Sequence, residues 1–237
     1  MALFVTCLVD LMRPRIASAS LRLLEAAGAS AVVPAGQTCC GQPAWNAGAA
    51  ASARALARKT IVELEPYEAV VVPSGSCAGM IRVHYPRALA DDAHWRARAE
   101  RVAAKTFELT EFLAPRLAAP PARRTGPVTY HDCCSGLREL GIKAQPRALL
   151  ARVPGLELRE MRDSETCCGF GGSFAVKFGA VSCAMASAKC AAARATGASA
   201  LVLGDLGCLL HLEGRLRREG GAPLSLLHVA ELLGGIA

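Results

Sequence analysis

The chain has 237 residues and a formal net charge of +7, with 52% apolar and 20% charged residues, which is the composition of a packed globular protein and excludes a disordered one. No apolar run reaches the roughly 18 to 20 residues of a membrane span, and the N-terminal MALFVTC lacks the basic region of a signal peptide, so we expect a cytoplasmic protein. The arginines are scattered rather than gathered in a stripe with aromatic residues, which argues against nucleic-acid binding.

Apolar patterning and Pro/Gly punctuation predict alternating strands and helices in the first half of the chain. Pro14 suits the first turn of a helix that Gly28 ends. In chain order we predict a strand over residues 3–5, a helix over 14–27, a strand over 30–34, an alanine-rich helix over 47–64 and a buried strand over 69–72.

The second half repeats this order after a segment, 117–127, whose Pro, Gly and charge content is that of a linker. Strands are predicted over 128–130, 156–159 and 201–203, with helices over 146–153 and 181–195. Strands that alternate with helices indicate parallel α/β packing. We therefore predict an α/β protein of two duplicated parallel-sheet βαβ units, 1–120 and 127–237, related by a pseudo-two-fold axis.

The eleven cysteines support the duplication. A Cys-Cys-Gly motif occurs twice, and each copy has one cysteine upstream and one downstream at gaps that agree between the halves to within three residues. Stable disulfides are not expected in a reducing compartment. The repeated frame consists of Cys7, Cys39, Cys40 and Cys77 in the first half and Cys134, Cys167, Cys168 and Cys208 in the second.

Each repeated cysteine follows a predicted strand. In open parallel α/β sheets, binding groups gather at the carboxyl ends of the strands, so we expect the four thiols of each half to converge on one crevice. Thiolates are soft ligands that select iron–sulfur clusters, zinc or copper(I). The frame therefore predicts a metal site in each half, and we name all eight cysteines as its ligands.

Five segments resemble the CCG cysteine-rich domain found in heterodisulfide reductase and in the iron–sulfur component of glycolate oxidase: QTCCGQPAWNAG, PSGSCAGM, HDCCSGLRELG, ETCCGFGGSFAVKF and GDLGCLLHLEG. Over nearly the whole chain the sequence resembles the lactate utilisation protein A family more closely. This resemblance implies a cytoplasmic subunit with one or two [4Fe–4S] clusters that passes on electrons from the oxidation of lactate to pyruvate. It also implies other subunits, including a ferredoxin-like iron–sulfur protein.

The broader CCG pattern ends each half in Cys-x-x-Cys, whereas Met80 and His211 stand at that last position here. Four cysteines in each half suffice for a cubane, so we do not expect the five-thiolate, noncubane clusters of the heterodisulfide relatives. Met80 is expected to pack in the core. His211 is expected on a helix surface, with ligation as the alternative.

Five further residues attract attention through their chemistry. Cys183 and Cys190 lie outside the repeated frame and are expected to be core residues. Cys133 is interpreted as a spare thiol, because Cys134 matches Cys7 better. His131 is expected to order its loop, and His228 to lie on a terminal helix.

Two other functions remain open. Four thiolates also satisfy tetrahedral zinc, so the chain could be a zinc-stabilised structural subunit, with zinc in one half. A thiol–disulfide reductase of the heterodisulfide reductase type, acting through the adjacent cysteine pairs, ranks last. The glycine-rich loop after Cys168 lacks the following lysine of a P-loop, so no nucleotide site is predicted. Whether the chain is itself an oxidoreductase is left open.

Overall fold

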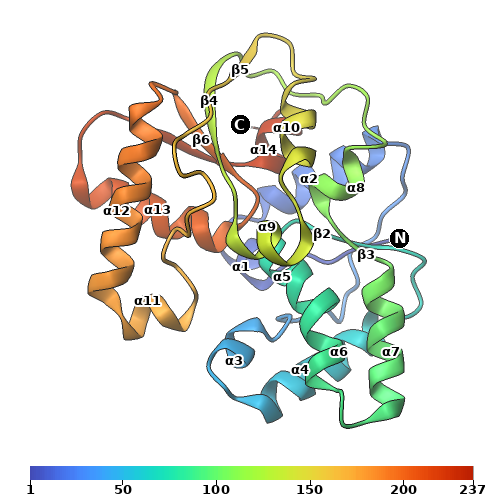
Figure 1. The fold of residues 1–237 in the computed structure, drawn as a ribbon. Helices are drawn as coiled ribbons and strands as arrows, with labels where there is room; N and C mark the ends of the chain where they lie inside the picture. Colours follow the sequence, from blue (N-terminus) through green and yellow to red (C-terminus); the bar gives the residue numbers. More distant parts are fainter. Residues whose placement is uncertain (237) are drawn as a thin grey trace.

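The computed structural model describes residues 1–236, which form an α/β fold with two parallel sheets (Figure 1). Neighbouring strands follow the order β1-β2-β3 in the first sheet and β5-β4-β6-β7 in the second. Their bounds are β1 (Ala2–Leu3), β2 (Val70–Val72), β3 (Thr106–Glu108), β4 (Gly126–His131), β5 (Leu156–Leu158), β6 (Ala200–Leu203) and β7 (Ser225–His228).

The two sheets have the same strand order, which confirms the predicted duplicated parallel units. In the first sheet an isolated parallel bridge joins Val32 to Ala2 of β1. This bridge stands where β5 pairs with β4 in the second sheet. The strand expected over 30–34 is thus reduced to a single bridge at the exposed edge of its sheet.

The strands of the first sheet are continuous apolar runs, so both faces of this sheet have to be covered. Side chains alternate between two cores: Val70 and Val72 join one cluster, and Val71 joins the other. Helices of the first half cover it; their bounds are α1 (Cys7–Met12), α2 (Arg15–Ala26), α3 (Gln42–Asn46), α4 (Ala50–Leu64), α5 (Gly75–Gly79), the π-helical turn η1 (Met80–His84), α6 (Tyr85–Ala88), α7 (Ala93–Ala104) and α8 (Leu109–Leu113).

Both helices expected in the first half are present. The prediction over 14–27 corresponds to α2, and the one over 47–64 corresponds to α4, which begins only at Ala50. Gly48 separates α4 from the short α3, because its φ of +77° is a left-handed conformation that ends a helix. Helix α4 therefore begins three residues later than predicted, and the loop that carries Cys39 and Cys40 lies before α3.

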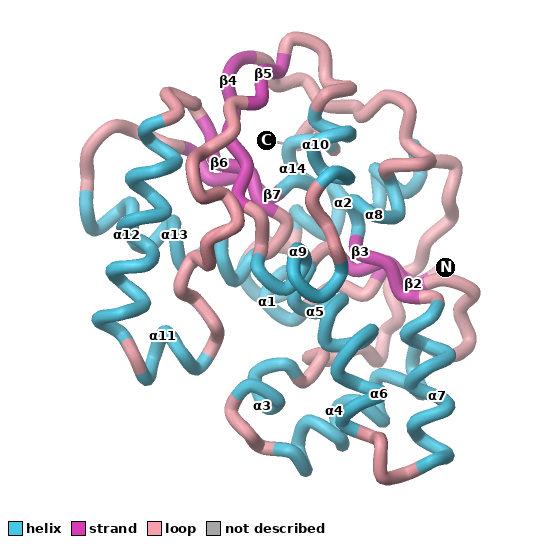
Figure 2. The backbone as a smooth tube through the Cα atoms, viewed as in Figure 1, coloured by secondary structure: helices cyan, strands magenta, loops and turns pink. Residues whose placement is uncertain are grey.

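The second half contains the helices predicted over 146–153 and 181–195, with shifted ends, and four others. The bounds are α9 (Cys134–Leu140), α10 (Ala144–Leu150), α11 (Ser173–Lys177), α12 (Gly179–Ala195), α13 (Leu206–Glu219) and α14 (Val229–Leu233). Figure 2 shows α11, α12 and α13 on one side of the second sheet and α10 and α14 near the other.

The last strand of each sheet, β3 and β7, was not predicted. Each leads directly into a short helix with a capping box, formed by Glu108 with Glu111 and by His228 with Glu231. The expectation that His228 lies on a terminal helix is therefore wrong. His228 ends β7 and caps α14, because pairing with β6 holds the apolar residues before it in a strand.

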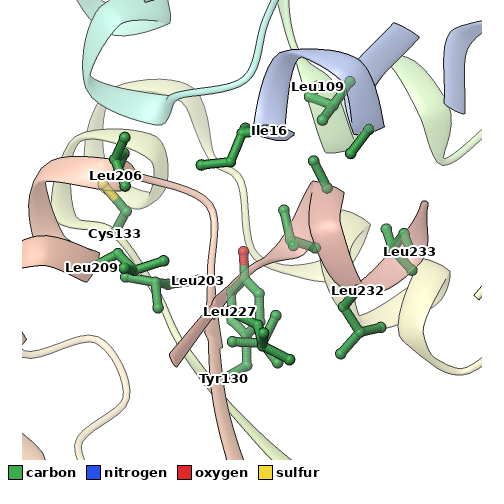
Figure 3. Packing of buried hydrophobic residues seen from close by; sticks show 14 of the residues in the cluster. Ile16, Leu109, Tyr130, Cys133, Leu203, Leu206, Leu209, Leu227, Leu232 and Leu233 are labelled. Atoms are coloured by element: carbon green, nitrogen blue, oxygen red, sulfur yellow. The ribbon is translucent and has the colours of Figure 1, made fainter. Parts of the chain in front are cut away.

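The halves share a core. Helix α2 of the first half packs on α14 of the second, and the larger apolar cluster contains residues from both halves, such as Ile16 and Leu233 (Figure 3). Residues 114–125 between α8 and β4 carry no helix or strand, as expected of a linker, and the division into units 1–120 and 127–237 stays a prediction. Within residues 1–236, no helix is long and apolar enough to cross a membrane.

Candidate metal centre

The first four cysteines of the frame come together at the carboxyl ends of β1 and β2. Cys7 is the first residue of α1, and Cys77 is the third residue of α5. Cys39 and Cys40 lie in the loop before α3. The Sγ atoms of Cys40 and Cys77 are 3.4 Å apart, and the Cys39 thiol hydrogen-bonds to both Cys7 and Cys40.

The second four have the same arrangement. Cys134 is the first residue of α9, Cys208 is the third residue of α13, and Cys167 and Cys168 lie in the loop before α11. The Sγ atoms of Cys134 and Cys167 are 3.9 Å apart, and the Cys208 thiol contacts that of Cys168. The structure thus brings together the four expected cysteines of each half.

The glycine of each Cys-Cys-Gly motif shapes its loop. Gly41 and Gly169 both have a φ of +88°, a left-handed conformation that favours glycine. The N–H groups of Gly41 and Gly169 donate to the Sγ atoms of Cys39 and Cys167, each at 3.4 Å. A Cβ atom at Gly169 would lie 2.7 Å from the backbone oxygen of Ser182. The glycine is therefore required both for the turn and for the approach of α12.

A buried hydroxyl anchors each loop. The Tyr85 hydroxyl donates to the backbone oxygen of Cys40 at 2.8 Å. In the second half the Ser182 hydroxyl donates to the backbone oxygen of Gly169 at 2.8 Å and lies 3.2 Å from His211 Nε2. His211 therefore supports the second loop through Ser182 from the partly buried side of α13.

Negative charge is favoured at the first cysteine of each pair. Hydrogen bonds from Cys40 and Cys7 lower the pKa of Cys39, and those from Cys134 and Cys168 lower the pKa of Cys167. The pKa of Cys7 is raised, chiefly by its hydrogen bond to Cys39 and by burial. The thiolate is the form that binds metal, so each set holds one cysteine that is already suited to bind. A metal that bound the neighbouring thiols would release their protons.

Both sets face one pocket of about 400 Å³ between the halves, which nine of the eleven cysteines line. Its wall also contains the aromatic residues Trp45 and Phe170, together with Glu139. His84 Nε2 of the first half lies 3.3 Å from Glu139 Oε1 of the second. In Figure 1 the cysteine-bearing helices α1, α5 and α9 lie together at the centre of the molecule.

The backbones of the two halves lie close together at two glycines. A Cβ atom at Gly75, the first residue of α5, would lie 2.9 Å from the Cα atom of Gly136 in α9. Only residues without a side chain allow this contact. It brings Cys77 and Cys134 to the same pocket.

The cysteines outside the frame behave differently from one another. Cys190 is buried in the core as expected, whereas Cys183 is exposed on α12, so the expectation of a core position is wrong for Cys183. The helix turns Cys183 to solvent because its buried face passes through Ser182, Ala186 and Cys190. Met80 is fully buried among apolar residues, as expected.

Cys133 and His131, which both precede Cys134, were expected to have minor roles. Cys133 is nine-tenths buried, lines the pocket and contacts Cys208. His131 ends β4 with no exposed surface, and burial lowers its pKa to about 4, so the imidazole is neutral at pH 7. Asp205, three residues before Cys208, also reaches the pocket. A signal for Asp205 existed in the sequence, because Ser74 precedes Cys77 by the same interval.

Comparison with known proteins agrees with this geometry. The model of the CCG cysteine-rich domain family matches residues 1–82 and 128–213. The lactate utilization protein A of Anoxybacillus flavithermus is 43% identical over 98% of this chain and 97% of its own length. That of Geobacillus kaustophilus is 42% identical over the same shares.

A solved structure shares the fold. The crystal structure of a hypothetical protein from Helicobacter pylori superposes with a TM-score of 0.71 over 98% of this chain at 10% identity. This chain spans about half, 47%, of the length of that protein. The fold and the two cysteine sets therefore define a CCG cysteine-rich protein. Within that class, the chain belongs to the lactate utilization protein A family.

The donor groups fit a thiophilic metal. Soft thiolates at 3.4 and 3.9 Å from one another suit iron–sulfur, zinc or copper(I) sites and disfavour magnesium or calcium. Two further groups of close donors occur in the second half: His131 with Cys168 and Cys208, and Cys133 with Asp205 and Cys208. The cysteine sets of the chain could therefore bind a metal.

Proposed function

We propose that this chain is the iron–sulfur subunit of a cytoplasmic lactate (2-hydroxyacid) oxidation system and passes electrons to partner subunits. The observation that carries the proposal is the convergence of both cysteine sets on one pocket. The names of the relatives supply the substrate class. The cysteines are all free thiols, which suits a reducing compartment.

A [4Fe–4S] cluster in a cysteine set would supply a one-electron carrier, and two such carriers match the two electrons that a 2-hydroxyacid releases. The eight cysteines of the frame would hold the clusters. The N–H groups of Gly41 and Gly169 already donate to cysteine sulfur, and such hydrogen bonds tune the potential of a cluster. Trp45 and Phe170 add apolar surface to the wall of the pocket beside the sulfurs.

The proposal places the hydride acceptor in a partner subunit, because the sequence contains no dinucleotide-binding fingerprint. Its glycine-rich loop is explained by the cysteines, and no dinucleotide fingerprint follows a strand. A hydride acceptor would therefore lie in another subunit, and the resemblance to the lactate utilisation family implies a ferredoxin-like iron–sulfur protein as a further partner. A one-electron route between the subunits would start from the common pocket.

A specific distance favours a second candidate, a zinc-stabilised subunit. Tetrahedral zinc with Zn–S bonds of about 2.3 Å places its sulfurs about 3.8 Å apart. The Cys40–Cys77 and Cys134–Cys167 separations are 3.4 and 3.9 Å. A cubane distributes its four thiolates over four iron atoms, so the sulfurs of a set would have to spread to hold one.

Elemental analysis separates the two candidates. The protein is purified anaerobically, and iron, acid-labile sulfide and zinc are counted per chain before and after reconstitution with iron and sulfide. We expect a brown protein with at least one cluster. A colourless protein that holds zinc and rejects iron favours the second candidate, and a protein that binds neither metal contradicts both.

A further inference from the structure

His131 is a buried imidazole whose ring nitrogens are unused. It has no exposed surface, and neither Nδ1 nor Nε2 has a hydrogen-bond partner among the described residues. The backbone carbonyl of Ser164 interacts with the ring, short of hydrogen-bond geometry for either nitrogen. A buried polar group without a partner is costly, so the position needs a reason.

Metal-ligating atoms lie beside this ring. A ring nitrogen of His131 and the Sγ atoms of Cys168 and Cys208 lie within 4.8 Å of one another, and all three residues are buried. The Cys133 thiol lies next to this group, because it contacts the thiol of Cys208. Two or three thiols and one imidazole are a common donor set of tetrahedral zinc.

The first half has no such group. Cys134 matches Cys7, because each begins a helix after the first strand of its unit. Phe4 therefore stands at the position of His131, three residues before the cysteine, and it is fully buried in an apolar core. Thr6 likewise stands at the position of Cys133. The second unit thus has an imidazole and an additional thiol where the first unit has Phe4 and Thr6.

We propose that His131 is a metal ligand and holds the metal of the second site together with Cys168 and Cys208. The second site is then a mixed imidazole and thiolate site, and the first is built from thiolates alone. The inference rests on the proposed function in one respect, that metal occupies the second cysteine set. The Ser164 carbonyl would orient the ring nitrogen that faces away from the metal, as such carbonyls do for ligating histidines.

The experiment uses Co²⁺ as the probe, because it takes tetrahedral sulfur and nitrogen sites as zinc does and is paramagnetic. The full chain is freed of metal with a chelator and reductant under argon, and Co²⁺ is titrated against the sulfur-to-cobalt charge-transfer absorption. Pulsed EPR on protein grown with ¹⁵N-histidine reads whether a histidine nitrogen is bound. Neither readout depends on catalytic activity.

Three variants give the comparison. His131→Phe installs the residue that the first unit carries at this position, so packing is retained. His94→Gln is the control, because it removes an exposed imidazole on α7 that does not line the pocket. His131→Cys replaces the nitrogen ligand with a sulfur ligand. Circular dichroism checks that each variant is folded before the titration.

We expect wild type and His94→Gln to show a histidine nitrogen bound to Co²⁺. His131→Phe should lose this coupling and bind one Co²⁺ at least about 10-fold more weakly, which is the loss that even an outer-shell partner of a metal ligand causes. His131→Cys should recover the affinity without the coupling. A wild-type spectrum without histidine nitrogen, or unchanged binding in folded His131→Phe, overturns the inference and leaves the proposed function standing. If neither cysteine set of the wild-type protein binds a metal, both the inference on His131 and the proposed function are overturned.

Discussion

Ser74 and Asp205 occupy the same position in the two halves, and their side chains bond to each other. Each is the N-cap of the helix that carries the last cysteine of its set. The Ser74 hydroxyl donates to Asp205 Oδ2 at 2.8 Å, and the N–H of Ser76 donates to the same oxygen at 3.1 Å. The carboxylate of the second unit thus bonds to the helix start that positions Cys77 of the first.

Ser74→Ala should destabilise the protein by about 2 to 3 kcal/mol, because it removes an N-cap and a buried hydrogen bond to a charged group. Urea unfolding measures the loss. Ser18→Ala, an exposed position on α2, is the control and should change the free energy of unfolding by no more than about 0.5 kcal/mol. A double-mutant cycle with Asp205→Asn should give a coupling energy above about 0.5 kcal/mol. Additive effects would show that the two side chains do not interact.

The contact of Gly75 with Gly136 predicts a steric effect between the units. Gly75→Ala places a methyl group 2.9 Å from the Cα atom of Gly136, and such overpacking costs about 1 to 3 kcal/mol. Gly179→Ala is the control, because a Cβ atom there meets nothing within 4 Å and alanine favours the helix. Thermal unfolding should give a lower midpoint for the first variant and an equal or higher one for the second. Equal midpoints for Gly75→Ala and wild type would contradict the close approach.

The duplicated frame and the convergence of the cysteines could be predicted from the sequence, because both follow from local rules. A cysteine directly after a buried strand lies at the carboxyl end of a parallel sheet wherever that strand pairs. Gly28 ends the first predicted helix through its backbone conformation, which neighbouring sequence largely decides, whereas the similar role of Gly48 was not predicted.

Other features depend on pairing between distant segments and could not be predicted. The strand that ends at His228 is a short apolar run next to a short helix, and periodicity alone does not separate the two. The common pocket and the bond between Ser74 and Asp205 require the relative placement of the two units. The sequence shows that His131 lies near Cys134, but only the fold brings it to Cys168 and Cys208.

Glu108 predicts a pH dependence of stability. Burial raises its pKa from 4.5 to about 7. Between these values the unfolded chain releases a proton that the folded protein keeps, so rising pH destabilises the folded state through this window, by on the order of 3 kcal/mol in total. Glu108→Gln removes the titration and keeps an acceptor oxygen for the N–H groups of Thr110 and Glu111.

The test is urea unfolding at pH 5 and at pH 8. The stability of Glu108→Gln relative to wild type should increase between these two values. Glu68→Gln, at an exposed position, should follow wild type at both. A difference between Glu108→Gln and wild type that does not change with pH would contradict the raised pKa.

The cysteine frame predicts which thiols hold metal. Cys40 and Cys168 are buried at the second position of each pair, in contact with Cys77 and Cys208. Replacing either with serine should remove metal from its own half, because a hydroxyl is a poor substitute for a thiolate. Cys183→Ser, on the exposed face of α12, should leave the metal content unchanged. Iron, sulfide and zinc per chain, measured on anaerobic protein, decide the outcome. Loss of metal from the Cys183 variant with full retention in the Cys168 variant would place the site elsewhere, because the pocket contains Cys168 and excludes Cys183.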